Sequence, residues 1–181
     1  MERRYARFRR APIDQYPGAT EVPDKGMCLS VFLVLEHPER PGSVLVGQLD
    51  PSGPWWEVGA IDPNRVRAIG ERWMLPSCQL ILFESPMDAA HRILKEQLGS
   101  PPIPLEGPFV FSDPSPRPES PGKDPHWDIH FVYRGRWESR KLPATPVWKR
   151  LDFVEVARTA RGQFARDQGD VLELVGLRPR D

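Results

Sequence analysis

The chain has 181 residues, and its 25 lysines and arginines are balanced by 25 aspartates and glutamates. This length is typical of one domain with one sizeable core, and 39% hydrophobic with 28% charged residues excludes a disordered chain. The zero net charge gives no overall field that would favour nucleic acid, and no apolar run approaches the roughly 18 residues of a membrane span.

Residues 1–25 are predicted to form an arm that precedes one folded domain at 26–178. The opening segment, MERRYARFRR, carries five arginines and one glutamate. It also lacks the apolar core of a signal peptide. The two cysteines, Cys28 and Cys78, stand in apolar surroundings, which favours free thiols and a cytoplasmic protein.

The first half of the domain is predicted to contain three strands. The apolar, β-branched run at 27–37 and the segment 43–50 flank the turn PERPG, so we expect them to pair as a hairpin. The segment 51–72 has no regular pattern and receives no assignment. A short strand is expected at 79–83.

The second half is predicted to add one long helix, three strands and a short helix. The long helix covers 86–98, and strands follow at 105–113, 126–137 and from 147. A loop at 114–125 has five prolines among its twelve residues, and a short helix is expected within 167–177. Few helices among many strands indicate an α/β protein with a mixed sheet and helices packed on it.

The long helix has clear signals at both ends. Ser85 suits the N-cap, Pro86 suits the first helical position and Asp88 completes a capping box, while Gly99 suits the residue beyond the last turn. An apolar face recurs at spacings of three and four residues. Asp88, Arg92 and Glu96 form a second stripe, which by itself indicates only a solvated row of ion pairs.

The wider segment WMLPSCQLILFESPMDAAHRILKEQLG, 73–99, resembles the signature of the Nudix superfamily. That signature is a glycine, five residues, a glutamate, seven residues and then Arg-Glu-apolar-x-Glu-Glu-x-Gly. Glu84, Arg92, Glu96 and Gly99 occupy matching places. The resemblance implies a Nudix-like α/β/α sandwich with a mixed central β-sheet, and it implies that Glu84 and Arg92 form a buried pair that shapes the loop before the helix.

The same segment departs from the signature at positions that bear on metal binding. In the family this helix supplies carboxylates to magnesium or manganese, and the metal activates water for attack on a diphosphate. Ile93 and Gln97 replace two of the expected glutamates. The resemblance therefore implies an incomplete Mg²⁺ or Mn²⁺ site with Glu96 as its anionic ligand and Gln97 as a weaker amide ligand.

The absence of a glutamate after the arginine is similar to the GDP-mannose mannosyl hydrolase branch of the family. That branch uses a loop histidine as general base, which makes His126, together with Glu96, a catalytic candidate. Arg92 and Trp127 are the substrate-binding candidates, Trp127 through stacking on a nucleobase. The alternative is that His126 is an exposed loop histidine without a catalytic role.

Three functional hypotheses follow for this chain. The first is a Nudix-type hydrolase of a nucleoside diphosphate linked to another group, such as a nucleotide sugar. The second is a catalytically inactive Nudix-fold module that binds a nucleotide-type ligand or a protein. The third is RNA binding through the arginine-rich arm, which rests on ten residues. The sequence leaves a homodimer open. No membrane partner is expected.

Overall fold

The computed structural model describes residues 7–8, 27–115, 126–139, 141–142, 145, 147–165 and 168–179. For 7–8, 27, 113–115 and 126–127 the backbone alone is described. The predicted arm, 1–25, therefore lies outside the described residues except for strand β1, Arg7–Phe8, which pairs with the beginning of β2.

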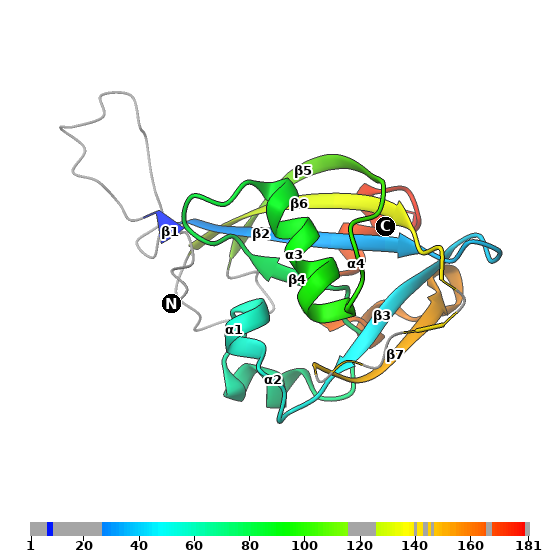
Figure 1. Cartoon of the computed structure of the whole chain (residues 1–181), viewed down its shortest axis with the longest axis horizontal. Helices are drawn as coiled ribbons and strands as arrows, with labels where there is room; N and C mark the ends of the chain where they lie inside the picture. Colours follow the sequence, from blue (N-terminus) through cyan, green and yellow to red (C-terminus); the bar gives the residue numbers. More distant parts are fainter. Residues whose placement is uncertain are drawn as a thin grey trace.

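One mixed sheet forms the centre of the molecule (Figure 1). Its main strands follow the order β5-β6-β2-β3-β7, and β1 and β4 also pair with β2. The strands are β2 (Met27–Glu36), β3 (Ser43–Leu49), β4 (Ser77–Gln79), β5 (Leu105–Ser115), β6 (His126–Arg136) and β7 (Trp148–Glu155). The β2–β6 pair is parallel and the other pairs are antiparallel, so the expected mixed α/β sheet is confirmed.

The helices divide between the two faces of the sheet. Helix α3 (Pro86–Leu98) lies across β2 and β4 (Figure 1), and its apolar side chains join the larger core cluster with those of β2. Helix α4 (Gly169–Leu174) contributes Val171 and Leu172 to a second cluster that includes Phe32 and Val34 of β2. Because side chains alternate along a strand, β2 contributes residues to both clusters. The sheet and the helices on its two faces form the layers of an α/β/α sandwich.

The expected hairpin between β2 and β3 is confirmed, since the two strands pair antiparallel through Glu36 and Val44, and β3 then pairs along its length with β7. One local expectation is wrong. The expected strand at 79–83 ends at Gln79, because Ile81 and Glu84 then close a turn in which the Glu84 N–H donates to the Ile81 carbonyl at 3.0 Å.

The unassigned segment 51–72 contains two short helices, α1 (Trp55–Gly59) and α2 (Pro63–Ile69). Asp62 caps α2 by accepting hydrogen bonds from the backbone N–H groups of Asn64 and Arg65. Trp55 is buried against Trp148, with ring centroids 4.7 Å apart in an edge-to-face arrangement. Within the described residues, no helix is both long enough and apolar enough to cross a membrane.

Candidate functional site

Helix α3 has a capping residue at each end, Ser85 and Gly99. The Ser85 hydroxyl accepts a hydrogen bond from the Asp88 N–H at 3.1 Å and donates to the Asp88 carboxylate at 2.7 Å. Gly99 has a φ of 58°, and its N–H donates to the Leu94 carbonyl. These caps hold the helix and the loop before it in one arrangement.

Glu84 and Arg92 form an ion pair beneath the loop that precedes α3. Arg92 Nε lies 2.7 Å from Glu84 Oε1, and Arg92 Nη2 lies 2.8 Å from Glu84 Oε2. Their side chains are only 11% and 13% exposed. Burial alone would lower the pKa of Arg92, but the hydrogen bonds and charge of Glu84 outweigh it, so the pKa lies above its ordinary value and the guanidinium stays charged.

The same pair fastens the loop to strand β4. Arg92 Nη2 also donates to the Gln79 carbonyl at 3.0 Å and contacts Cys78 Sγ at 3.3 Å, while Glu84 Oε2 accepts the Ile81 N–H at 3.0 Å. A ligand contact by Arg92 would have to use Nη1, which is buried and has no hydrogen-bond partner in the described structure. Arg92 is thus placed as a residue of the loop frame.

Cys78 lies beside this pair as a neutral thiol. Burial raises its pKa to about 12, even though the charge of Arg92 acts in the opposite direction. A neutral, buried thiol is neither a nucleophile nor a metal ligand.

Ile93 stands in the hydrophobic core. It is 1% exposed and belongs to the larger cluster, together with Ala89, Ala90 and Leu94 of the same helix. A carboxylate at this position would be surrounded by apolar side chains and shielded from water, so the position does not suit the metal ligand that the signature would place at 93.

Gln97 is fully buried, and both the nitrogen and the oxygen of its amide group form hydrogen bonds within the fold. Its Nε2 donates to the carbonyls of Ser77, at 2.7 Å, and Val58, at 3.0 Å, while its Oε1 accepts the Ser77 N–H at 3.3 Å. Its backbone carbonyl accepts from Trp148 Nε1 at 3.0 Å. Gln97 therefore joins α3 to α1, β4 and β7. Its amide oxygen accepts one of these hydrogen bonds.

Glu96 is half-buried, and its negative charge acts on both Cys78 and Arg92. Of the three helix positions that the resemblance assigns to metal, it alone carries a carboxylate. Magnesium requires several oxygen ligands in a near-octahedral array. The described parts of the chain contain no group of three or more His, Cys, Asp or Glu side chains that could hold a metal ion. These residues do not fit a divalent cation.

His126 and Trp127 lie at the beginning of β6. The backbone of Trp127 pairs with Met27 of β2 and with Pro114 of β5. The side chains of His126 and Trp127 lie outside the described residues, so their roles as base and stacking platform stay predictions.

Sequence reasoning missed the partners of Gln97. Ser77 and Val58 contribute backbone groups, which leave no trace in residue type. The one available signal was the amide itself, because a glutamine can donate and accept at a buried backbone where a carboxylate can only accept.

Comparison with known proteins supports the fold. No family model and no curated protein matches the chain. The NUDIX domain of Shewanella oneidensis NrtR, solved with ADP ribose, is 17% identical over 88% of this chain and 90% of that domain, with a TM-score of 0.55. A MutT NUDIX hydrolase from Burkholderia pseudomallei is 14% identical over 82% of this chain and 98% of its own, at 0.56. An Ap4A hydrolase from C. elegans is 15% identical over 82% and 94%, at 0.53.

Proposed function

From the premise that this chain has the Nudix fold, we propose that it binds a nucleoside diphosphate linked to another group and does not hydrolyse it. The observation that carries the proposal is the buried side chain of Gln97, with all three hydrogen bonds directed to the backbone of neighbouring elements. With Ile93 in the core, two of the three family ligand positions serve packing in this chain.

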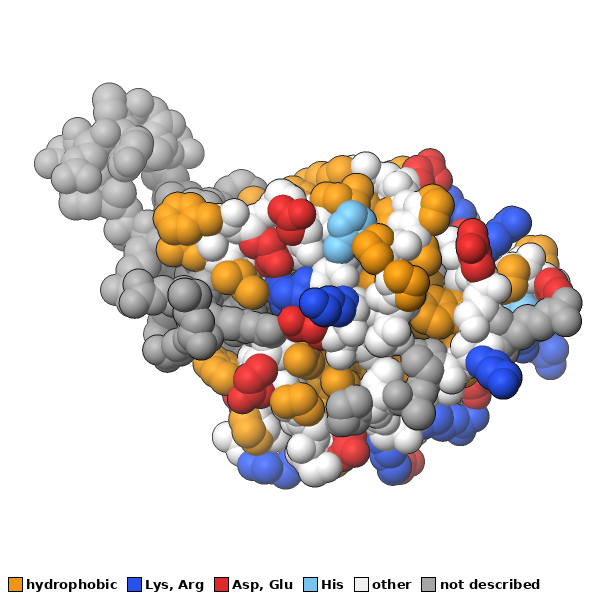
Figure 2. Space-filling model, in the orientation of Figure 1, with side chains coloured by type: hydrophobic (Ala, Val, Ile, Leu, Met, Phe, Trp, Pro, Cys, Tyr) orange, Lys and Arg blue, Asp and Glu red, His pale blue; other side chains and the backbone are white. Residues whose placement is uncertain are grey.

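The loop frame supports the binding part of the proposal. The Glu84–Arg92 pair and both caps of α3 are intact, so the loop–helix unit has a defined shape. The NrtR domain, which shares this fold, is solved with ADP ribose. On the face that carries α3, acidic, basic and apolar side chains are interspersed (Figure 2). This distribution fits a small ligand better than a nucleic acid, which would require a continuous basic surface.

Hydrolysis by a sparse site is the second candidate. Glu96 favours this candidate, because it keeps a carboxylate on α3 whose charge acts on Arg92. His126 would be its general base. This candidate requires further ligands that the described residues do not supply.

The test is a paired binding and turnover panel on the full chain. Calorimetry would measure the binding of ADP ribose, nucleotide sugars and diadenosine tetraphosphate. Chromatography would measure their hydrolysis with Mg²⁺ or Mn²⁺. We expect saturable binding of at least one compound and no turnover of any.

The variant Glu96→Gln distinguishes the two candidates. Removal of a carboxylate near an anionic ligand should leave its affinity unchanged or raise it, and Glu138→Gln, at an exposed position elsewhere, serves as the control. Metal-dependent turnover that Glu96→Gln abolishes would establish the hydrolase instead. The absence of binding across the whole panel would defeat the proposal.

A further inference from the structure

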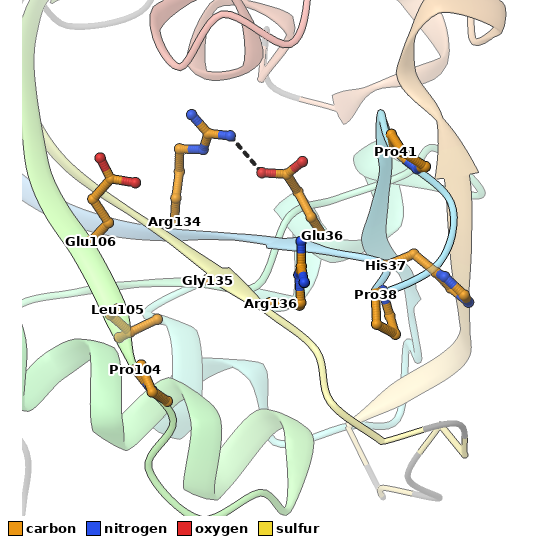
Figure 3. Close-up of a pocket in the computed structure, with 10 residues that line it drawn as sticks. All are labelled: Glu36, His37, Pro38, Pro41, Pro104, Leu105, Glu106, Arg134, Gly135 and Arg136. Atoms are coloured by element: carbon orange, nitrogen blue, oxygen red, sulfur yellow. Dashed lines mark hydrogen bonds and ion pairs between the residues drawn. The ribbon is translucent and has the colours of Figure 1, made fainter.

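A separate cavity lies at the end of the sheet where β2 and β6 finish. Its volume is about 550 Å³, a size that suits a small-molecule ligand. Residues from the end of β6 form its middle, with the start of β5 on one side and the β2–β3 turn on the other (Figure 3). No lining residue belongs to α3 or to the loop before it.

Gly135 allows one wall of the cavity to form. It is the register partner of Leu105, and a Cβ at this position would lie 2.8 Å from Leu105 Cδ2 and 3.1 Å from the Pro104 carbonyl oxygen. A larger residue would require Leu105 and the backbone at Pro104 to shift, so Gly135 lets the start of β5 lie directly against β6.

Four charged side chains share one face of the sheet beside this wall. Glu106 is the register partner of Arg134, and Glu36 is the register partner of Arg136. Arg134 and Arg136 are two residues apart on one strand, so their side chains point to the same side. Figure 3 shows Glu106, Arg134 and Glu36 on that side.

Two of these four charges neutralise each other. Arg134 Nη2 lies 2.6 Å from Glu36 Oε1, and Arg134 Nη1 donates to the Val175 carbonyl at 3.4 Å. Arg134 is therefore held in place between β2 and the end of α4. Its charge is committed to Glu36.

The other two charges, on Glu106 and Arg136, are exposed. Within the described part of the chain neither side chain makes a hydrogen bond or an ion pair. As diagonal neighbours on adjacent antiparallel strands, their Cα atoms are about 7–8 Å apart. The cavity thus presents one cation and one anion, and a molecule of a few atoms can bridge them.

Besides Gly135, the rest of the lining consists of apolar residues and of His37, which can donate a hydrogen bond. Pro38, Pro41, Pro104 and Leu105 are its apolar members, and the side chain of Leu105, next to Glu106 on β5, points to the other side of the sheet (Figure 3). His37 Nδ1 accepts the Glu39 N–H at 3.0 Å, so in the neutral ring Nε2 carries the hydrogen and can donate. The His37 ring is held edge-to-face against Phe153 at 4.7 Å.

We propose that this cavity binds a zwitterionic small molecule of the amino-acid class. Its carboxylate contacts the Arg136 guanidinium, which is suited to bidentate contact with two oxygens. Its ammonium contacts the Glu106 carboxylate, and its methylene groups span the distance between these two side chains. The site is independent of the nucleotide-binding proposal, so either can fail alone.

The test is an amide-resolved NMR titration of the full chain. The probes are a series of ω-amino acids of increasing length: β-alanine, γ-aminobutyrate, δ-aminovalerate and ε-aminocaproate. Valerate and pentylamine serve as single-charge controls. At least one zwitterion should cause saturable shifts at the amides of residues 36–37, 105–106 and 134–136, with a Kd at least about tenfold below that of either control.

Two variants complete the test. Arg136→Ala and Glu106→Gln should each raise the Kd about tenfold or more. Both positions are exposed, and the spectra report whether the fold is kept. Arg67→Ala, an exposed arginine on α2, should leave the Kd unchanged. The proposal is overturned if these amides show no saturable shifts, if valerate or pentylamine binds as tightly as the zwitterions, or if either pocket variant leaves the Kd unchanged.

Discussion

At the scale of single residues, Gln97 has the greatest influence on the site. A glutamate in its place would keep the shape of the side chain but would lose both donors, and it would face the carbonyls of Ser77 and Val58 with negative charge. The backbone groups around the helix therefore determine that an amide, and not a carboxylate, is the stable side chain at position 97.

Gln97→Glu is expected to lower the free energy of unfolding by about 3 kcal/mol, because a buried charged group without donors costs more than a lost neutral hydrogen bond. Urea unfolding followed by circular dichroism would measure the change. Lys95→Gln, at an exposed position of the same helix, is the control and should change little. A Gln97→Glu protein as stable as the parent would contradict the assigned hydrogen bonds.

Phe83 has a backbone conformation that lowers the stability of the folded protein. Its φ is 71°, in the left-handed region, and its side chain is 97% exposed, so burial does not offset the backbone strain. Phe83→Gly should raise the free energy of unfolding by about 0.5–1 kcal/mol. Leu82→Gly, in the same turn but without a positive φ, should lower it, and thermal unfolding of both variants would decide between these signs.

At the scale of elements, the loop before α3 depends on the Glu84–Arg92 pair. The pair connects this loop, α3 and β4 through hydrogen bonds to Ile81 and Gln79. Removal of one partner leaves the other charge buried, which is more damaging than the loss of an exposed pair.

Glu84→Ala should accordingly lower the free energy of unfolding by about 3 kcal/mol, because it leaves the Arg92 guanidinium buried and uncompensated. The matched control is Glu71→Ala, which breaks the exposed Glu71–Lys149 pair and should have no measurable effect. Equal effects of the two substitutions in chemical denaturation would show that the Glu84–Arg92 pair is not structural.

At the scale of the whole molecule, burial of Cys78 couples global stability to alkaline pH. The folded pKa is raised to about 12 from an ordinary 9.0, so the neutral thiol is favoured by folding. Above pH 9.0 the unfolded chain loses this proton first, and the contribution to stability declines as pH rises toward the folded pKa.

Between these two values the free energy of unfolding should fall by about 1.4 kcal/mol per pH unit through this group. Other groups also titrate there, so the quantity to measure is the difference between the parent and Cys78→Ala at each pH. That difference should shrink as pH rises above 9.0. A difference independent of pH would mean that Cys78 ionises equally in both states.

What the sequence alone determined is local or strongly patterned. The ends of α3, at Ser85 and Gly99, follow from side chains within a few residues of the termini, and the apolar run at 27–37 corresponds to the central strand β2. The start of α2 at Asp62 and Pro63 has the same kind of cap, but the irregular pattern of 51–72 does not predict the seven-residue helix that follows.

The tertiary structure alone decided what positions 93 and 97 do. Gln97 meets Ser77 and Val58, 20 and 39 residues earlier in the chain, and Ile93 is enclosed by residues from several elements. The cavity at Arg136 likewise depends on the register of three strands. Side-chain type records which contacts a residue is able to make. Which of them it makes depends on chain segments that the folded sheet and helices bring together.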